Sequence, residues 1–154
     1  MKLSGLIYVH RISDVRMGGI SSRNFRMFRK LCGDDTLKNV VIVTNMWGEV
    51  GQAKGEMREA ELKNKFFKPA LDKGAQMLRH DNTVESAHNI LRHIIQNHPL
   101  PLKIQRELVD EKKDIGQTAA AQEVESQIQD LIHKHQAEMK QLQGEMQGSS
   151  LFLR

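Results

Sequence analysis

Four consecutive β-branched apolar residues, Val40–Val43, restrict the fold of this chain more than any other feature. A strand with one face in water alternates apolar and polar side chains, so an unbroken apolar run is typical of a strand covered on both faces in a parallel sheet. The run ends in Thr44-Asn45-Met46-Trp47, which contains the only tryptophan. Ligands bind at the carboxyl ends of such strands, so residues 44–47 are either a binding site or a turn in which Trp47 covers the core.

Two further segments predict strands, with helical segments between them. Residues 3–12, "LSGLIYVHRI", form the first strand with residues 6–9 as its buried centre, and residues 75–80, "AQMLRH", form the third. This alternation predicts βα units and a parallel sheet with helices on its faces.

Three helices are predicted around these strands. The first is capped by Ser21 or Ser22 and ends at Gly33, the second covers residues 55–72 with a kink at Pro69, and the third begins at a capping box formed by Asn82 and Glu85. The expected core-facing residues are Phe25, Phe28 and Leu31 in the first helix, Met57, Ala60, Phe67 and Leu71 in the second, and Val84, Ala87, Leu91, Ile94 and Ile95 in the third.

From about Lys103 the composition shifts to Gln, Glu, Lys and Ala, which predicts a long helical tail. Apolar or semi-apolar side chains, which we call the seam, occur at positions 124, 128, 131, 135, 139, 142 and 146. Their mean spacing of about 3.67 residues is nearer to the eleven-residue repeat than to the heptad and indicates a straight or slightly right-handed seam. We therefore divide the chain into a domain at 1–101 and a helical tail with coiled-coil character at 102–154.

Composition narrows the class of protein. Of 154 residues, 39% are apolar, which is low for a globular domain and indicates that part of the chain does not pack into a core. The single cysteine, Cys32, excludes an internal disulfide and is expected to be a buried packing residue in a reducing compartment. The sequence shows no signal peptide and no run of about 18 apolar residues, so we expect no membrane association. These features predict a cytosolic or nuclear protein, and of the two we predict a cytoplasmic location.

The motifs of common enzymes are missing. The chain contains no GxxxxGK[ST] phosphate loop, no GxGxxG fingerprint and no GxSxG elbow. His133 and His135 lie two residues apart and so point to different faces of a helix, and Cys32 has no neighbouring base. We therefore predict no catalytic residue and no metal site.

Basic residues do not indicate nucleic acid as the partner. The formal net charge is +4, and Arg23, Arg26, Arg29 and Lys30 fall in one predicted helix. No aromatic residues are arranged among them for base stacking, so we expect a solvated helix face.

Polar residues lie at the carboxyl ends of all three predicted strands. They are His10, Arg11 and Asp14 at the end of the first strand, Thr44 to Trp47 at the end of the second, and His80, Asp81 and Asn82 at the end of the third. Since the carboxyl ends of parallel strands meet at one edge of a sheet, we expect these residues to converge there. We call this edge the rim.

Three longer stretches resemble a known family. The segments "LSGLIYVHRISDVRMGG", "RNFRMFRKLCGDDTLKNVVIVTNMW" and "KPALDKGAQMLRHDNT" are similar to the C-terminal half of fungal G-domain proteins related to the septin-like and immunity-associated P-loop GTPases. The resemblance covers about residues 3–115. It implies an α/β fold, namely part of a three-layer P-loop NTPase-like domain with a parallel sheet. It also implies binding of GTP or GDP with Mg²⁺. The family's phosphate loop, first switch and DxxG segment would lie upstream of Leu3, so the resemblance implies a truncated G domain.

Within this resemblance, "TNMW" stands at the guanine-reading Asn/Thr-Lys-x-Asp motif. Thr44 keeps a hydroxyl, Asn45 takes the place of the lysine, and Trp47 takes the place of the aspartate. An indole cannot accept the two N–H bonds of guanine, and hydrogen bonds to charged groups contribute about 1.5 to 3 kcal/mol each. Asp81 and Asn82, near the family's other base-contacting loop, would supply part of the lost polarity. The resemblance thus implies a base-side nucleotide site at Thr44, Asn45, Trp47, Asp81 and Asn82.

Two functional hypotheses follow. The first is a nucleotide-binding G-domain fragment that, without its phosphate loop, hydrolyses no GTP and binds GTP or GDP with Mg²⁺ weakly or not at all. The alternative is a protein-interaction or oligomerisation module in which the tail pairs with itself, giving a homo-oligomer, or with a helical protein partner.

Overall fold

A parallel sheet forms the centre of the fold. The computed structural model describes residues 2–14 and 18–151, with side chains placed up to residue 146. The sheet is three-stranded and has the order β1 (Leu6–Arg11), β2 (Val40–Asn45), β3 (Gln76–Arg79). Both strand pairs are parallel. The central strand β2 is buried from Val40 to Thr44, as its unbroken apolar run predicts.

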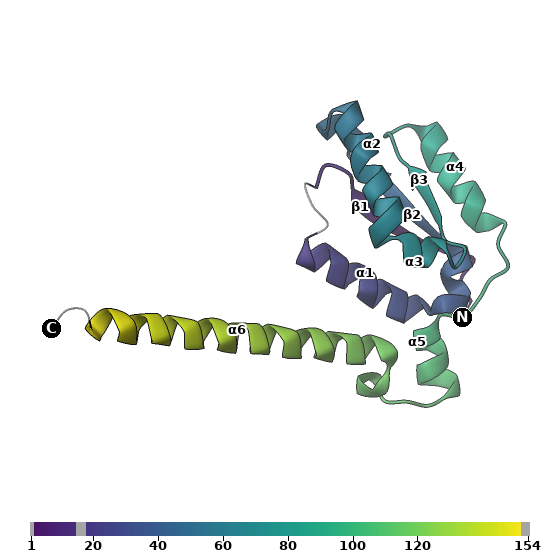
Figure 1. Cartoon of the computed structure of the whole chain (residues 1–154). Coiled ribbons are helices and arrows are strands. Elements are labelled where there is room, and N and C mark those ends of the chain that lie inside the picture. Colours follow the sequence, from purple (N-terminus) through teal and green to yellow (C-terminus); the bar gives the residue numbers. More distant parts are fainter. Residues whose placement is uncertain (1, 15–17, 152–154) are drawn as a thin grey trace.

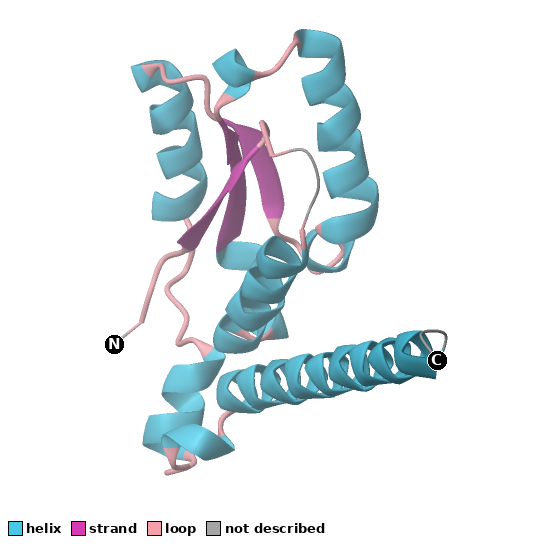
Figure 2. Cartoon of the chain, turned by 90° about the vertical axis from the view of Figure 1, so that its left-hand side faces the viewer, coloured by secondary structure: helices cyan, strands magenta, loops and turns pink. Residues whose placement is uncertain are grey.

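Helices lie on both faces of the sheet (Figure 2). The helices are α1 (Gly19–Cys32), α2 (Gln52–Glu61), α3 (Lys68–Leu71), α4 (Val84–Ile95), α5 (Lys103–Gln105) and α6 (Ala119–Leu151). Helix α1 connects β1 to β2, and α2 and α3 connect β2 to β3. Figure 1 shows α6 running beside α1 and extending well past it. The chain is therefore an α/β protein with a long C-terminal helix, as the sequence predicts.

The larger core lies between the sheet and helices α1 and α3, and it is rich in aromatic rings. Phe25 packs against Phe67 with ring centroids 4.6 Å apart, and Tyr8 lies 5.0 Å from both Phe25 and Phe28. Phe67 is completely buried. Edge-to-face aromatic pairs stabilise a core beyond the area that they bury, so these rings add to the stability of this side of the sheet.

The opposite face of the sheet is covered less completely. Helix α4 places Ile90 over Val41 and Val43 of β2. The neighbouring side chains of β1 remain open, with Ile7 41% exposed and Val9 56% exposed. The prediction that residues 6–9 form a buried centre is therefore wrong for Ile7 and Val9. The reason is that β1 is an edge strand and α4 covers β2.

Helix α4 differs from its prediction in register. Its buried residue is Ile90, which the predicted apolar stripe omits, whereas Val84 is 71% exposed, Leu91 47% and Ile95 69%. The cap differs as well, because the Thr83 hydroxyl accepts a hydrogen bond from the Ser86 amide at 3.1 Å. The N-cap is therefore Thr83, one residue after the predicted Asn82, and the predicted capping box of Asn82 and Glu85 is wrong.

The other helices deviate less from their predictions. Helix α1 is capped at Gly18 instead of Ser21 or Ser22, and it ends at Gly33 as predicted, with a φ of +78° that favours glycine. The expected helix over residues 55–72 is divided by a π-helical turn, Leu62–Phe66. Pro69 lies in the first turn of α3, just after this break.

Two predicted core residues of the second helix are exposed. Met57 is 67% exposed, and Ala60 is exposed as well. Leu62 and Gly55 are buried in their place. These four residues show that the predicted helical face is rotated relative to the real one.

We call the sheet together with the helices packed on it the body. The chain remains part of this body for about 25 residues after residue 101. Glu107 is 2% exposed, and its carboxylate accepts a hydrogen bond from the Ala119 amide at 3.2 Å, which satisfies one free N–H at the start of α6. Arg26 of α1 then pairs with Glu123 of α6 at 3.2 Å. From residue 128 to residue 146, every residue of α6 is exposed.

Within the described ranges, no helix combines the length and apolar content that a membrane span requires.

Candidate functional site

The carboxyl ends of the three strands lie side by side, as the sequence predicts. His10 of β1 is in register with Thr44 of β2, which is in register with Arg79 of β3. The His80 amide donates to the Thr44 carbonyl at 2.8 Å. Residues of the predicted base-side site therefore share one rim, but their side chains do not share one face.

Strand alternation separates Thr44 from Asn45. Thr44 is completely buried and lies on the face of the sheet that packs against α1 and α3, together with Ile42. Asn45 lies on the opposite face, in a groove that it shares with Val43. The two residues that the family resemblance assigns to one base-side site thus point to opposite layers.

Trp47 packs into the body. Its indole Nε1 donates to the Thr44 carbonyl oxygen at 3.1 Å and to the Thr44 Oγ1 at 3.2 Å. The Arg79 guanidinium lies over the indole ring at 4.2 Å from its centroid, in a cation–π arrangement. A Cβ at Gly55 would lie 2.9 Å from the ring, so the chain packs closely there too. The only hydrogen-bond donor of the indole is therefore engaged inside the protein.

Arg79 is itself fixed by an ion pair. Its Nε donates to the Glu59 carboxylate of α2 at 2.8 Å, and its Nη2 donates to the second carboxylate oxygen. Sequence reasoning missed both residues. Glu59 lies 20 residues from Arg79 and carries no motif, so only the tertiary fold shows that the pair covers Trp47.

Asp81 and Asn82 belong to the loop that starts α4. The Asp81 carboxylate accepts a hydrogen bond from the Thr83 hydroxyl at 2.6 Å and another from the Thr83 amide at 3.1 Å. Hydrogen bonds from the Thr83 and Ser86 side chains lower the pKa of Asp81 to about 2. Asn82 is exposed and adopts a left-handed φ of +67°, a conformation that asparagine tolerates. Both residues therefore have a local structural role in forming this loop.

An apolar groove of about 350 Å³ runs along the open face of β1 beside α4. Asn45 and His80 are its polar lining, and its apolar lining comes from Ile7, Val9, Val43, Ala87, Ile90 and Leu91. The Asn45 Oδ1 atom is buried and has no hydrogen-bond partner among the described residues. His80 is engaged through Nδ1 with the Ser86 hydroxyl at 2.8 Å. A ligand in this groove would find mostly apolar surface, with Asn45 and His80 as the polar residues of the lining.

The polar residues at the end of β1 are engaged in contacts within the protein. His10 is buried against the Phe67 ring, with centroids 5.5 Å apart, and burial lowers the pKa of its imidazole while Asp14 raises it. Arg11 instead pairs with Glu49 at 3.1 Å. Over residues 2–14 and 18–151, no three His, Cys, Asp or Glu side chains are arranged to bind a metal ion.

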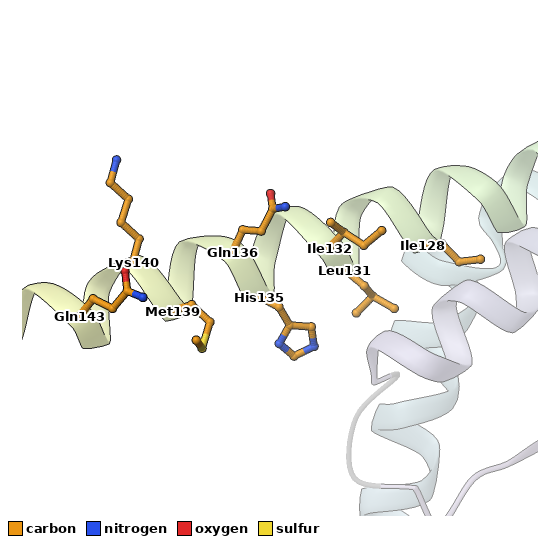
Figure 3. Close-up of a pocket in the computed structure, with 8 residues that line it drawn as sticks. All are labelled: Ile128, Leu131, Ile132, His135, Gln136, Met139, Lys140 and Gln143. Carbon is orange, nitrogen blue, oxygen red and sulfur yellow. The ribbon is translucent and has the colours of Figure 1, made fainter.

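A second set of exposed apolar side chains lies on α6, outside the rim. Ile128 is 50% exposed, Met139 58% and Leu142 55%, although each is a large apolar side chain. Figure 3 shows Leu131, His135 and Met139 projecting to one side of the helix, with Leu131 near α1 and Met139 farther along the free part of the helix. The seam predicted from the sequence is thus a continuous exposed surface.

We compared the chain with protein-family models, curated proteins and solved structures, and none of them matches it. The G-domain resemblance is therefore a prediction that depends on the quoted segments alone.

Proposed function

We propose that this chain is an oligomerisation module, in which α6 of one copy pairs with α6 of another. The observation that carries this proposal is the contrast between a firmly anchored helix start and a stretch over residues 128–146 in which every residue is exposed.

Exposed apolar side chains on a long single helix favour this function. Most of the stability of a protein helix comes from tertiary packing of its apolar face, and an isolated helix is marginal in water. Ile128, Leu131, Ile132, Met139 and Leu142 are all exposed on this helix. Contiguous apolar surface of this kind marks interaction sites. A second copy supplies a seam of the same length and composition.

The test compares charges placed on two faces of the same helix. The seam variant carries Ile128→Glu and Leu142→Glu, and the matched control carries Gln129→Glu and Gln141→Glu on the outer face. Sedimentation velocity over rising protein concentration should show a dimer for the wild type and the control, and a monomer for the seam variant. Identical sedimentation of the seam variant and the control would contradict the proposal.

A second proposal is nucleotide-base binding at the rim. One observation favours it, namely the Asn45 amide oxygen, which is buried at the rim without a partner. Thr44 and Trp47 bind each other, so the base-side set has fewer free groups than the family motif implies. We expect no GTP hydrolysis and at most weak binding.

Calorimetry with GTP and Mg²⁺ tests this second proposal. Weak binding that disappears in Asn45→Ala and persists in Asn82→Ala would support a site at the Asn45 groove. Tight, Mg²⁺-dependent binding would contradict the expected weakness, and complete absence of binding would remove the site.

A further inference from the structure

We infer that two copies pair their α6 helices antiparallel, with a twofold axis at His135. This inference depends on the proposed self-association and specifies its geometry. The seam has spacings of 4, 3 and 4 residues before His135 and the same spacings after it. The spacing of the seam positions is therefore the same in both directions along the helix.

An antiparallel pair uses this symmetry at every seam position. Centred on His135, it places each seam residue opposite another seam residue of the second copy. The resulting pairs are Val124 with Met146, Ile128 with Leu142, Leu131 with Met139, and His135 with its own copy. Each pair except the central one is apolar on both sides.

The seam also keeps to one side of a straight helix. At about 100° of rotation per residue, all seven seam positions fall within about 40° of a line through His135. Two straight helices can therefore stay in contact along the whole seam, which spans 22 residues or about 33 Å. No supercoiling is required.

Charge on one flank favours the antiparallel direction. Lys134 and Glu138 lie on the same side of the seam, where they form an ion pair of 3.8 Å within one helix. In the antiparallel pair, Glu138 of each copy approaches Lys134 of the other, and opposite charges across such a flank set the orientation of helix pairs. A parallel pair would instead place Lys134 between Ile132 and Gln136 of the second copy.

The position of the body favours the same direction. Helix α1 packs beside the beginning of α6, where Arg26 contacts Glu123. A parallel pair would bring two bodies to the same end of the helices. The antiparallel pair places them at opposite ends, and the exposed C-terminal part of each α6 then covers the seam near the other body.

Disulfide formation between two single-cysteine variants tests the geometry. Mixing Leu131→Cys with Met139→Cys should give a disulfide-linked heterodimer, because these positions face each other in the antiparallel pair. Leu131→Cys alone should give none, because its two copies are separated by about 12 Å along the helices, beyond the reach of a disulfide. The native Cys32 is buried, and burial raises the pKa of its thiol to about 12, so the wild-type chain should remain unlinked.

A matched pair controls for random collision. Gln129 and Gln141 are also equally far from His135 on either side, but they lie on the outer face of the helix. A mixture of Gln129→Cys and Gln141→Cys should therefore not link. Circular dichroism of each variant confirms that α6 is intact.

Linking of Leu131→Cys with itself would show a parallel pair and overturn the inference. A dimer that depends on the seam in sedimentation, but does not link in the mixture, would overturn the antiparallel geometry and leave the proposed function standing. A chain that is monomeric at all concentrations would overturn both.

Discussion

The two parts of α6 belong to one continuous helix but are stabilised in different ways. In residues 119–127, Ala120 is 1% exposed, and the helix start is bound by the buried Glu107. In residues 128–146, every residue is exposed. The difference shows that packing against α1 covers part of the first stretch, whereas the second stretch packs against no other described element.

The largest expected effect is a difference in stability between a substitution in the core of the body and a substitution in the exposed part of α6. Phe67→Ala should lower the free energy of unfolding by about 3 to 5 kcal/mol, because it leaves a cavity among packed aromatic rings. Met139→Ala removes an apolar side chain of similar hydrophobicity from an exposed site and should leave the unfolding of the monomer unchanged. Urea denaturation at low protein concentration, followed by the fluorescence of the single tryptophan, measures both. Equal losses would contradict the comparison.

The next effect concerns the anchor of α6. Glu107→Ala should destabilise the chain by about 1 to 3 kcal/mol, because the Ala119 amide loses its acceptor and Lys113 loses a buried partner. The matched control is Glu111→Ala, since the exposed Glu111 pairs with the same Lys113 at 2.8 Å. The control should change stability by less than about 0.5 kcal/mol. Thermal unfolding distinguishes the two, and a larger loss in the control would contradict the anchoring role of Glu107.

The smallest effect concerns pH and the loop before α4. The pKa of Asp81 is lowered to about 2, below its value in an unfolded chain, so its stabilising contribution is fully present above about pH 4 and is lost as the pH falls toward 2. Asp81→Asn should therefore be less stable than the wild type at pH 6, and the two should converge near pH 2. Urea denaturation at several pH values provides the comparison. A stability difference that is independent of pH would show that the carboxylate charge plays no part.

The sequence predicts the fold where one local signal dominates. The unbroken apolar run of β2 identifies the central strand, and Gly33 marks the end of α1. The prediction fails where burial depends on neighbours. Ile7 and Val9 have the composition of a buried strand, but β1 lies at an edge of the sheet where α4 leaves these two side chains exposed. In α4, two adjacent apolar faces are possible, and only the packing on β2 selects Ile90.

The candidate site shows the same limit. The convergence of strand ends follows from parallel topology and could be predicted, but the direction of each side chain could not. Thr44 and Asn45 are adjacent in sequence and lie on opposite faces. The position of Trp47 depends on Arg79 and on Glu59, which reach it only in the folded chain. Similarly, the tail composition is uniform from residue 119 onwards, so it does not reveal where contact with α1 ends.

Hydrogen exchange of α6 at rising protein concentration tests the central claim most directly. If a second copy covers the seam, the amides of residues 128–146 should become more protected as concentration rises, while the amides of β2 stay equally protected throughout. The seam variant with Ile128→Glu and Leu142→Glu should show no such rise. Protection of residues 128–146 that is the same at low and high concentration would contradict the claim that α6 pairs with α6.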